Sequence, residues 1–325
     1  MNIATLTILA VGGHFVITDK MSLGDFAAFN QYLILLIFPI MIIGFMSNMI
    51  AQAGASYGRV KEVLEASETV HEGVLEKPLE GNIEFKDISV SYGDKPILKN
   101  ISFAIKASTK NAIIGPTAAG KTQLLYLLTG LINTTKGEIY FDGTNSDLYN
   151  KQNLQSEIGF VFQDSILFNL SLRENIAFSD SVNDESLQKA IETAELKEFI
   201  DTLPDGLNTM VSERGNSLSG GQKQRIMLAR ALALNPKILL LDDFTARVDT
   251  KTETKILKNV QRNYPDITLI SVTQKIASVK DFEQVVLLME GELIAKGTHE
   301  ELMSNCPEYV QIFDSQRSTN HYEQN

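Results

Sequence analysis

The sequence contains little cysteine, little histidine and no excess of positive charge. Its 325 residues include one cysteine, Cys306, which excludes an internal disulfide and is typical of a reducing compartment. The histidines lie at positions 14, 71, 299 and 321, so none falls between His71 and His299. A net charge of −11 argues against a general nucleic-acid-binding surface. The length fits two domains or one large one.

Charged residues are also missing from one long stretch near the N-terminus, from Phe26 to Gly58. About 20 apolar residues cross a bilayer as a helix, and such helices tolerate a proline like Pro39. A shorter apolar run, Ile3–Ile17, has no preceding basic residue and is not typical of a signal peptide. We therefore expect a transmembrane helical hairpin that turns at 18–25, in preference to a buried helix of a soluble domain.

The second helix of this hairpin is followed by Arg59 and Lys61, which mark its predicted cytoplasmic end. We expect it to continue through 58–66 and to be followed by an acidic linker. A polar tail that frays is expected at the C-terminus. The predicted organisation is a partial transmembrane domain at 1–66, a linker at 67–82, a second domain at 83–313 and the tail at 314–325.

The second domain alternates strand and helix patterns, which favours an α/β fold with a largely parallel sheet. The predicted strands are 83–92, 111–114, 137–141, 158–162, 237–242, 267–273, 284–289 and 292–296. The predicted helices are 120–130, 184–203, 221–234 and 251–263.

A phosphate-binding pattern, Gly115-x-x-x-x-Gly120-Lys121-Thr122, lies between one of these strands and a helix. In this arrangement backbone N–H groups and the helix N-terminus bind phosphate, and the lysine adds a positive charge. The threonine hydroxyl and an acid at the end of a neighbouring strand, Asp242, would hold Mg²⁺. A chance glycine turn does not explain strand, loop, Lys-Thr and helix in this order.

The stretch Leu218-Ser219-Gly220-Gly221-Gln222 precedes an amphipathic helix. A helix-capping serine with flexible glycines is one interpretation. With the phosphate loop and Asp242, however, the chain resembles the ATP-binding cassette family over about residues 80–313. The resemblance implies a parallel-sheet core with an antiparallel β subdomain and a helical subdomain, and ATP and Mg²⁺ as cofactors. "SERG" (212–215) and "GTHEEL" (297–302) resemble exporters in particular.

The resemblance also implies site residues. Tyr92 would stack on adenine, Gln163 would contact Mg²⁺, and Asp249 would cross a dimer interface. The implied nucleotide-binding residues are Tyr92, Gly115, Pro116, Thr117, Ala118, Ala119, Gly120, Lys121, Thr122, Gln123, Gln163, Ser219, Gly220, Gly221 and Gln222. The implied metal ligands are Thr122, Gln163 and Asp242, and the implied catalytic residues are Lys121, Gln163, Asp243 and Gln274.

In this family two cassettes pair head to tail, so a second half-transporter is the expected partner. We expect a multi-pass membrane protein whose ATP sites are cytoplasmic. No nucleic-acid partner is expected. The hairpin resembles the last two of six membrane helices. The first four would then be absent, as in a natural truncation or a fragment.

The sequence departs from the family pattern at four positions. Ala118 replaces a common glycine and Gln123 a small hydroxyl residue, and neither change breaks the phosphate-binding pattern. Asp243 replaces the catalytic glutamate and Gln274 the switch histidine. A shorter acid and an uncharged amide weaken base catalysis, while the signature at 218–222 is intact.

Together these changes resemble the degenerate half of a heterodimeric exporter, one that binds ATP and hydrolyses it slowly. The alternatives are a homodimer, drift in a non-functional fragment, or a regulatory module that does not transport. A soluble cassette protein of translation or DNA repair is disfavoured by the uncharged stretch.

Overall fold

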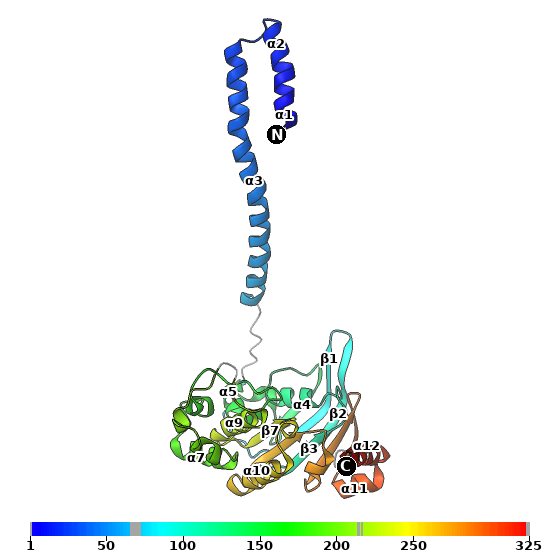
Figure 1. Cartoon of the computed structure of the whole chain (residues 1–325). Helices are drawn as coiled ribbons and strands as arrows, with labels where there is room; N and C mark the ends of the chain where they lie inside the picture. Colours follow the sequence, from blue (N-terminus) through cyan, green and yellow to red (C-terminus); the bar gives the residue numbers. More distant parts are fainter. Residues whose placement is uncertain (1, 66–72, 213–214, 216, 323–325) are drawn as a thin grey trace. The chain divides into compact units, whose positions relative to one another are not determined.

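The computed structural model describes residues 2–65, 73–212, 215 and 217–322, in two compact units, 1–70 and 71–325 (Figure 1). The linker residues 67–72 and two residues of "SERG", Glu213 and Arg214, lie outside the described part. The two units are described separately.

The first unit is a helical hairpin, as the sequence predicts. Its first arm comprises α1 (Asn2–Thr7), a π-helical turn η1 (Ile8–Gly12) and α2 (Gly13–Ile17), and its second arm is α3 (Leu23–Leu64). Ser22 caps α3 by accepting a hydrogen bond from the Asp25 N–H at 3.0 Å. The arms approach closely at Gly12, where an added Cβ would lie 2.7 Å from the Phe26 ring.

In the described part, α3 is the one helix long and apolar enough to cross a membrane by length and composition. It contains Pro39 and buries none of its residues within the structure. Its large apolar side chains are exposed, with Phe38 at 69% and Phe45 at 70%. The apolar helix of the first arm, Thr5–Ile17, is shorter than a membrane span requires.

The second unit begins with an antiparallel sheet in the order β2-β1-β4-β5. Its strands are β1 (Ile83–Tyr92), β2 (Lys95–Ile105), β4 (Lys136–Phe141) and β5 (Thr144–Asn145). Segment 73–82 precedes this sheet and is tied to it, since the Glu80 N–H donates to Asp142 Oδ2 at 2.7 Å.

A six-stranded sheet in the order β10-β9-β3-β8-β7-β6 forms the centre of the unit. Its strands are β3 (Lys110–Ile114), β6 (Ile158–Val161), β7 (Ile238–Asp242), β8 (Thr268–Val272), β9 (Gln284–Met289) and β10 (Glu292–Gly297). All pairs are parallel except β10 with β9. The expected α/β fold, with a parallel core and an antiparallel β subdomain, is confirmed.

Nine helices of the described part belong to this unit. They are α4 (Lys121–Leu128), α5 (Lys151–Ser156), α6 (Leu172–Ile176), α7 (Asp184–Thr193), α8 (Lys197–Asp201), α9 (Gly220–Ala233), α10 (Thr250–Asn263), α11 (His299–Asn305) and α12 (Pro307–Tyr322). Short 3-10 turns lie at η2 (Ser146–Leu148), η3 (Gly206–Asn208), η5 (Phe244–Ala246) and η6 (Ile276–Val279).

Strand β7 shows how the central sheet separates two cores. Leu239 and Leu241 belong to the cluster that includes α9 and α10 residues, whereas Ile238 and Leu240 belong to the cluster that includes α4 and the antiparallel sheet. All four side chains are at most 1% exposed. The strand is therefore apolar throughout because successive side chains enter opposite cores.

Several elements differ from the sequence-based expectation. The sequence patterns predict neither strand β2 nor the helices α5 and α6. The single helix expected over 184–203 is two helices, because Glu195 adopts a left-handed conformation (φ 56°) between α7 and α8. The expected fraying does not hold for residues 314–322, which continue α12.

Candidate functional site

Four predicted site segments lie along one edge of the central sheet. The phosphate loop follows β3, Gln163 follows β6, Asp242 ends β7 and Gln274 follows β8. The pairs Val161↔Leu241 and Asp242↔Val272 align the carboxyl ends of three of these parallel strands. Open parallel sheets bind ligands at this edge.

Two glycines of the phosphate loop are required by their surroundings. Gly115 and Gly120 have φ angles of 150° and 93°. A Cβ on Gly115 would lie 2.0 Å from the Leu288 carbonyl oxygen, and one on Gly120 would lie 2.5 Å from Leu98. The loop therefore keeps its backbone close to the sheet and to β2, while Pro116 and Thr117 at its tip are exposed.

The Lys121 side chain lies inside this loop. Its Nζ donates to the carbonyl oxygens of Gly115 at 2.9 Å and Pro116 at 2.7 Å, and the residue is 9% exposed. Burial lowers the pKa of Lys121, and the charges of Asp243 and Asp242 oppose that change. The two carboxylates therefore lie close enough to favour the ammonium form, which is the form that attracts phosphate.

Ala118 is strained in this loop, since its φ is 64° and alanine disfavours the left-handed region by roughly 1–2 kcal/mol. We expect Ala118→Gly to stabilise the protein by about 1 kcal/mol, because relief of this strain exceeds the added entropy of the unfolded chain. Thermal denaturation would measure the change. Ala119→Gly is the matched control: Ala119 is buried at 2% exposure, and its replacement should lower the midpoint. A lower midpoint for Ala118→Gly would contradict the prediction.

Thr122 and Asp242 form the candidate metal site. Thr122 Oγ1 donates to Asp242 Oδ1 at 3.1 Å, and Asp242 is 2% exposed. Its second oxygen, Oδ2, is buried and has no hydrogen-bond partner within the described part. Burial raises the pKa of Asp242, opposed by the Thr122 hydrogen bond. A hydroxyl beside a buried carboxylate oxygen with free acceptor capacity fits the hard oxygen ligands that Mg²⁺ prefers.

We expect Asp242→Asn to remove Mg²⁺-dependent stabilisation without destabilising the metal-free protein. The native pKa of Asp242 lies above the unfolded one, so stability falls as pH rises from the usual aspartate pKa through the raised native pKa. Asparagine cannot ionise and removes this loss. Melting curves at neutral pH with ATP, in Mg²⁺ or in EDTA, should show a Mg²⁺ shift for wild type and for the exposed control Asp266→Asn. A full shift in Asp242→Asn would refute the metal role.

Asp243 and Gln274 lie at the same edge of the central sheet, just after the ends of β7 and β8. Asp243 has a left-handed backbone (φ 48°), and its N–H donates to the Val272 carbonyl at 2.9 Å, which ties the end of β7 to β8. Gln274 is exposed, two residues beyond Val272. Gln163 is also exposed, and its carbonyl accepts a hydrogen bond from Gln224 Nε2 of α9 at 3.1 Å.

Tyr92 lies at the end of β1 and is 54% exposed. Its hydroxyl donates to Gln123 Oε1 at 2.8 Å. The sequence gives both residues as candidates but does not predict that they touch. The bond fixes the ring beside the first turn of α4, which follows the phosphate loop.

Ser219 caps α9 through a capping box. Its hydroxyl accepts from the Gln222 N–H at 3.2 Å, and its own N–H donates to Gln222 Oε1 at 2.8 Å. Ser219 and Gly220 are exposed, and a Cβ on Gly221 would lie 3.0 Å from the Arg247 carbonyl oxygen. The segment therefore presents a hydroxyl and a helix N-terminus at the surface.

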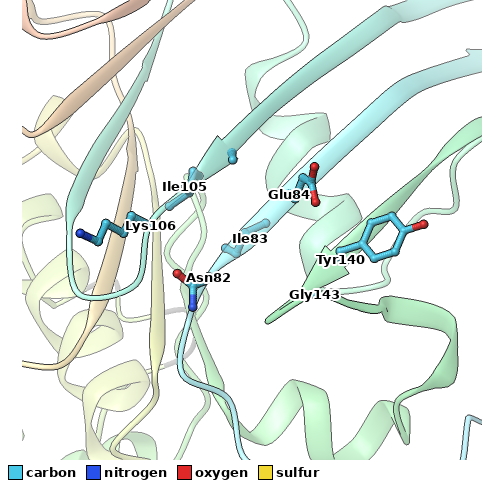
Figure 2. Close-up of a pocket in the computed structure, with 8 residues that line it drawn as sticks. Asn82, Ile83, Glu84, Ile105, Lys106, Tyr140 and Gly143 are labelled. Carbon is cyan, nitrogen blue, oxygen red and sulfur yellow. The ribbon is translucent and has the colours of Figure 1, made fainter.

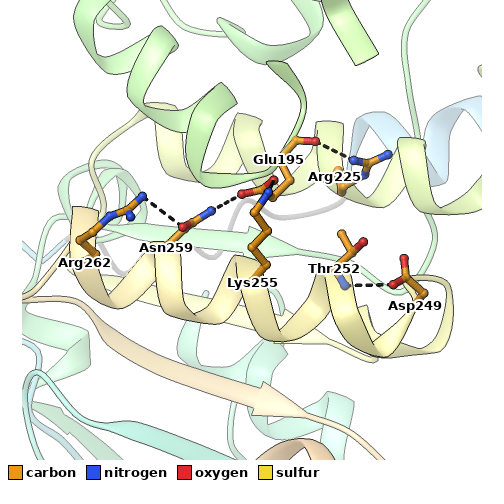
Figure 3. Close-up of polar contacts among 7 residues, drawn as sticks. All are labelled: Glu195, Arg225, Asp249, Thr252, Lys255, Asn259 and Arg262. Atoms are coloured by element: carbon orange, nitrogen blue, oxygen red, sulfur yellow. Dashed lines mark hydrogen bonds and ion pairs between the residues drawn. The ribbon is translucent and has the colours of Figure 1, made fainter. Parts of the chain in front are cut away.

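A junction that sequence reasoning missed connects α9 to α10 (Figure 3). The Glu195 carboxylate contacts Lys255 and accepts a hydrogen bond from Asn259 at 2.5 Å, and its carbonyl accepts one from Arg225 at 2.6 Å. Asp249 caps the same α10 through the Thr252 N–H at 2.9 Å. The helix that begins at the signature and the helix that follows Asp249 are thus held by one residue.

A separate pocket of about 350 Å³ lies on the antiparallel sheet (Figure 2). Its lining includes Asn82, Glu84, Lys106 and Tyr140, and none of the predicted site residues. It is distinct from the edge of the central sheet.

The fold and this edge define a phosphate-loop nucleotide-binding domain. The sequence family described as ABC transporter matches residues 98–246. The matched range contains the phosphate loop, Gln163, the signature, Asp242 and Asp243, and it excludes Tyr92 and Gln274. The chain carries the ATP-binding domain of the ABC transporter family.

Relatives extend the similarity to nearly the whole chain. It is 37% identical over 324 residues to the uncharacterised ABC transporter ATP-binding protein YknU of Bacillus subtilis, covering 97% of this chain and 55% of the relative. It is 34% identical to the ATP-dependent lipid A-core flippase of Desulfotalea psychrophila, covering 96% and 55%. A bacterial Atm1-family ABC exporter with ATP bound matches with a TM-score of 0.76 at 30% identity, covering 97% and 56%. The chain spans about half the length of these relatives.

Proposed function

We propose that the chain is the ATP-binding half of an ABC exporter that binds Mg-ATP in its own site and hydrolyses it slowly. ABC domains in general bind ATP and Mg²⁺, and the exporter and flippase among its relatives support the transport role. The ordered contacts of Lys121, Thr122 and Asp242 support nucleotide and metal binding.

One observation supports slow hydrolysis. Asp243 and Gln274 follow the adjacent strands β7 and β8, at the edge of the central sheet where Thr122 and Asp242 form the candidate metal site. Aspartate is one methylene shorter than the family's glutamate, and a displacement on the order of 1 Å can slow a reaction about 10²-fold. Glutamine can hydrogen-bond a phosphate oxygen but cannot carry a proton's charge. Both catalytic groups are weakened at once, while the phosphate loop is intact.

The partner in this proposal is a second half-transporter that carries glutamate and histidine at the matching positions. Ser219 and Gly220 are exposed at the start of α9, a position from which a hydroxyl and helix N–H groups can bind the γ-phosphate of an ATP held by another subunit. A homodimer would contain two slow sites, so the proposal favours a heterodimer.

For the first unit we propose that α3 crosses the membrane with Arg59 and Lys61 on the cytoplasmic side, which places the ATP-binding domain in the cytoplasm. Single cysteines at positions 20 and 61, in a chain without Cys306, would test this by labelling intact cells with an impermeant maleimide. Labelling at position 61 but not at 20 would contradict the orientation.

The purified chain tests the proposal directly. We expect it to bind Mg-ATP, to lose binding in Lys121→Ala, and to hydrolyse ATP slowly until a competent partner half is added. Rapid hydrolysis by the chain alone would refute the asymmetric role. Absence of ATP binding would favour a non-functional fragment, and ATP binding without any gain from a partner would favour a module that does not transport.

A further inference from the structure

The C-terminal helix α12 is anchored beside the segment that follows β8. Tyr309 is fully buried, and its hydroxyl lies 2.7 Å from His299 Nδ1 of α11. Phe313 contacts the same histidine ring with a centroid distance of 5.6 Å, and Lys280, just after η6, lies 4.8 Å from the Phe313 ring centroid. Tyr309, Phe313 and Gln316 follow at helical i, i+4, i+7 spacing, so they share one face of α12.

We call residues 273–276, which follow β8 and include Gln274, the switch segment. Gln316 on this face of α12 binds the backbone of this segment through both the nitrogen and the oxygen of its side-chain amide. Its Nε2 donates to the Gln274 carbonyl at 2.6 Å, and its Oε1 accepts from the Ile276 N–H at 3.0 Å. Gln274 and Lys275 lie outside any helix or strand. This segment has no β-sheet or helical hydrogen bonds at these positions, so the side chain of Gln316 satisfies the Gln274 carbonyl and the Ile276 N–H.

These two bonds fix the backbone on either side of Lys275. Ile276 is fully buried, so removal of the Gln316 side chain would leave its N–H buried and without this acceptor. The Lys275 N–H donates to Thr273 Oγ1 at 3.0 Å, which orders the same turn from the β8 side. Both of these hydrogen bonds join Gln316 to backbone atoms, so they do not depend on which side chain stands at position 274.

We propose that Gln316 is a positioning residue: it clamps the switch segment, so that α12 sets where the side chain at position 274 stands relative to the nucleotide edge. Its effect on turnover rests on the proposed function; the clamp itself does not. The clamp acts equally on glutamine and on a histidine introduced at position 274.

The test is amide hydrogen exchange of the full chain with Gln316→Ala, read at Ile276. We expect exchange of the Ile276 N–H to accelerate about tenfold, the size typical of one lost hydrogen bond. Gln316→Glu keeps the acceptor for Ile276 but places a negative oxygen against the Gln274 carbonyl, so protection of Ile276 should remain. Gln311 is an exposed glutamine on the same helix, so Gln311→Ala is the control and should leave exchange of the Ile276 N–H unchanged. Unchanged exchange in Gln316→Ala overturns the inference.

A second readout separates positioning from folding. In a chain that carries Asp243→Glu and Gln274→His, Gln316→Ala and Gln316→Glu should both lower kcat several-fold with little change in the KM for ATP, and Gln311→Ala should not. Unchanged kcat together with faster exchange would overturn the positioning role. If the double variant itself gains no turnover, the proposed function fails, and the exchange result still decides the clamp.

Discussion

Replacement of Ser219 by alanine is expected to lower ATP turnover of the paired transporter about 10- to 100-fold, whereas Asp243→Asn should change it less than about threefold. A hydrogen bond to a charged group contributes roughly 1.5–3 kcal/mol, which sets the larger figure. In the proposal Ser219 acts on the partner's competent site, and Asp243 acts in a site that is already slow. Steady-state hydrolysis by the pair in the membrane or in nanodiscs measures both.

Ser219 also caps α9, so loss of the cap must be separated from loss of a phosphate contact. Thr298→Ala removes a capping box of the same type from α11 and should leave turnover unchanged. Ser219→Asp keeps a good cap but adds a negative charge beside the phosphate, and it should be at least as harmful as Ser219→Ala. Equal losses from Ser219→Ala and Asp243→Asn, or normal turnover in Ser219→Asp, would contradict the account.

The second large effect is a gain. Asp243→Glu combined with Gln274→His should raise ATP hydrolysis by the purified chain about 10²-fold, because the longer acid restores the reach of a general base and histidine restores a group that titrates near neutral pH. Each single change should give a smaller gain than the pair. A colorimetric phosphate-release assay at saturating Mg-ATP is sufficient.

Lys121→Ala in the double-variant background is the control for this gain. Lys121 lies inside the phosphate loop, so its loss should return hydrolysis to the background rate. A double variant no faster than the natural chain would mean that these two positions do not limit hydrolysis. A gain that survives Lys121→Ala would point to a contaminating ATPase.

Much of the nucleotide edge could be predicted from sequence because its residues sit at fixed offsets from strand ends. The phosphate loop, Thr122 and Asp242 are an example: the last two are far apart in the chain, yet the motif and the apolar strand before Asp242 place them together, and the structure has them 3.1 Å apart. The position of Ser219 just before an amphipathic helix likewise predicts a helix cap, and the structure shows this cap.

Other features have no local signal. The break between α7 and α8 depends on Glu195 in a left-handed conformation, whose side chain is held by Lys255 and Asn259 of a distant helix. Gln316 lies in a polar segment that reads as a frayed tail, and its two bonds to the switch segment become visible only in three dimensions. Long-range polar contacts of this kind follow no periodicity.

The central claim is that this chain holds ATP and hydrolyses it much more slowly than its partner does. Photoactivatable azido-ATP, labelled in the α- or the γ-phosphate and crosslinked during turnover, tests this most directly, because the two chains separate by size or tag. The account predicts that this chain retains both labels, whereas the partner retains the α-label and loses the γ-label. Loss of the γ-label from both chains at the same rate would contradict it.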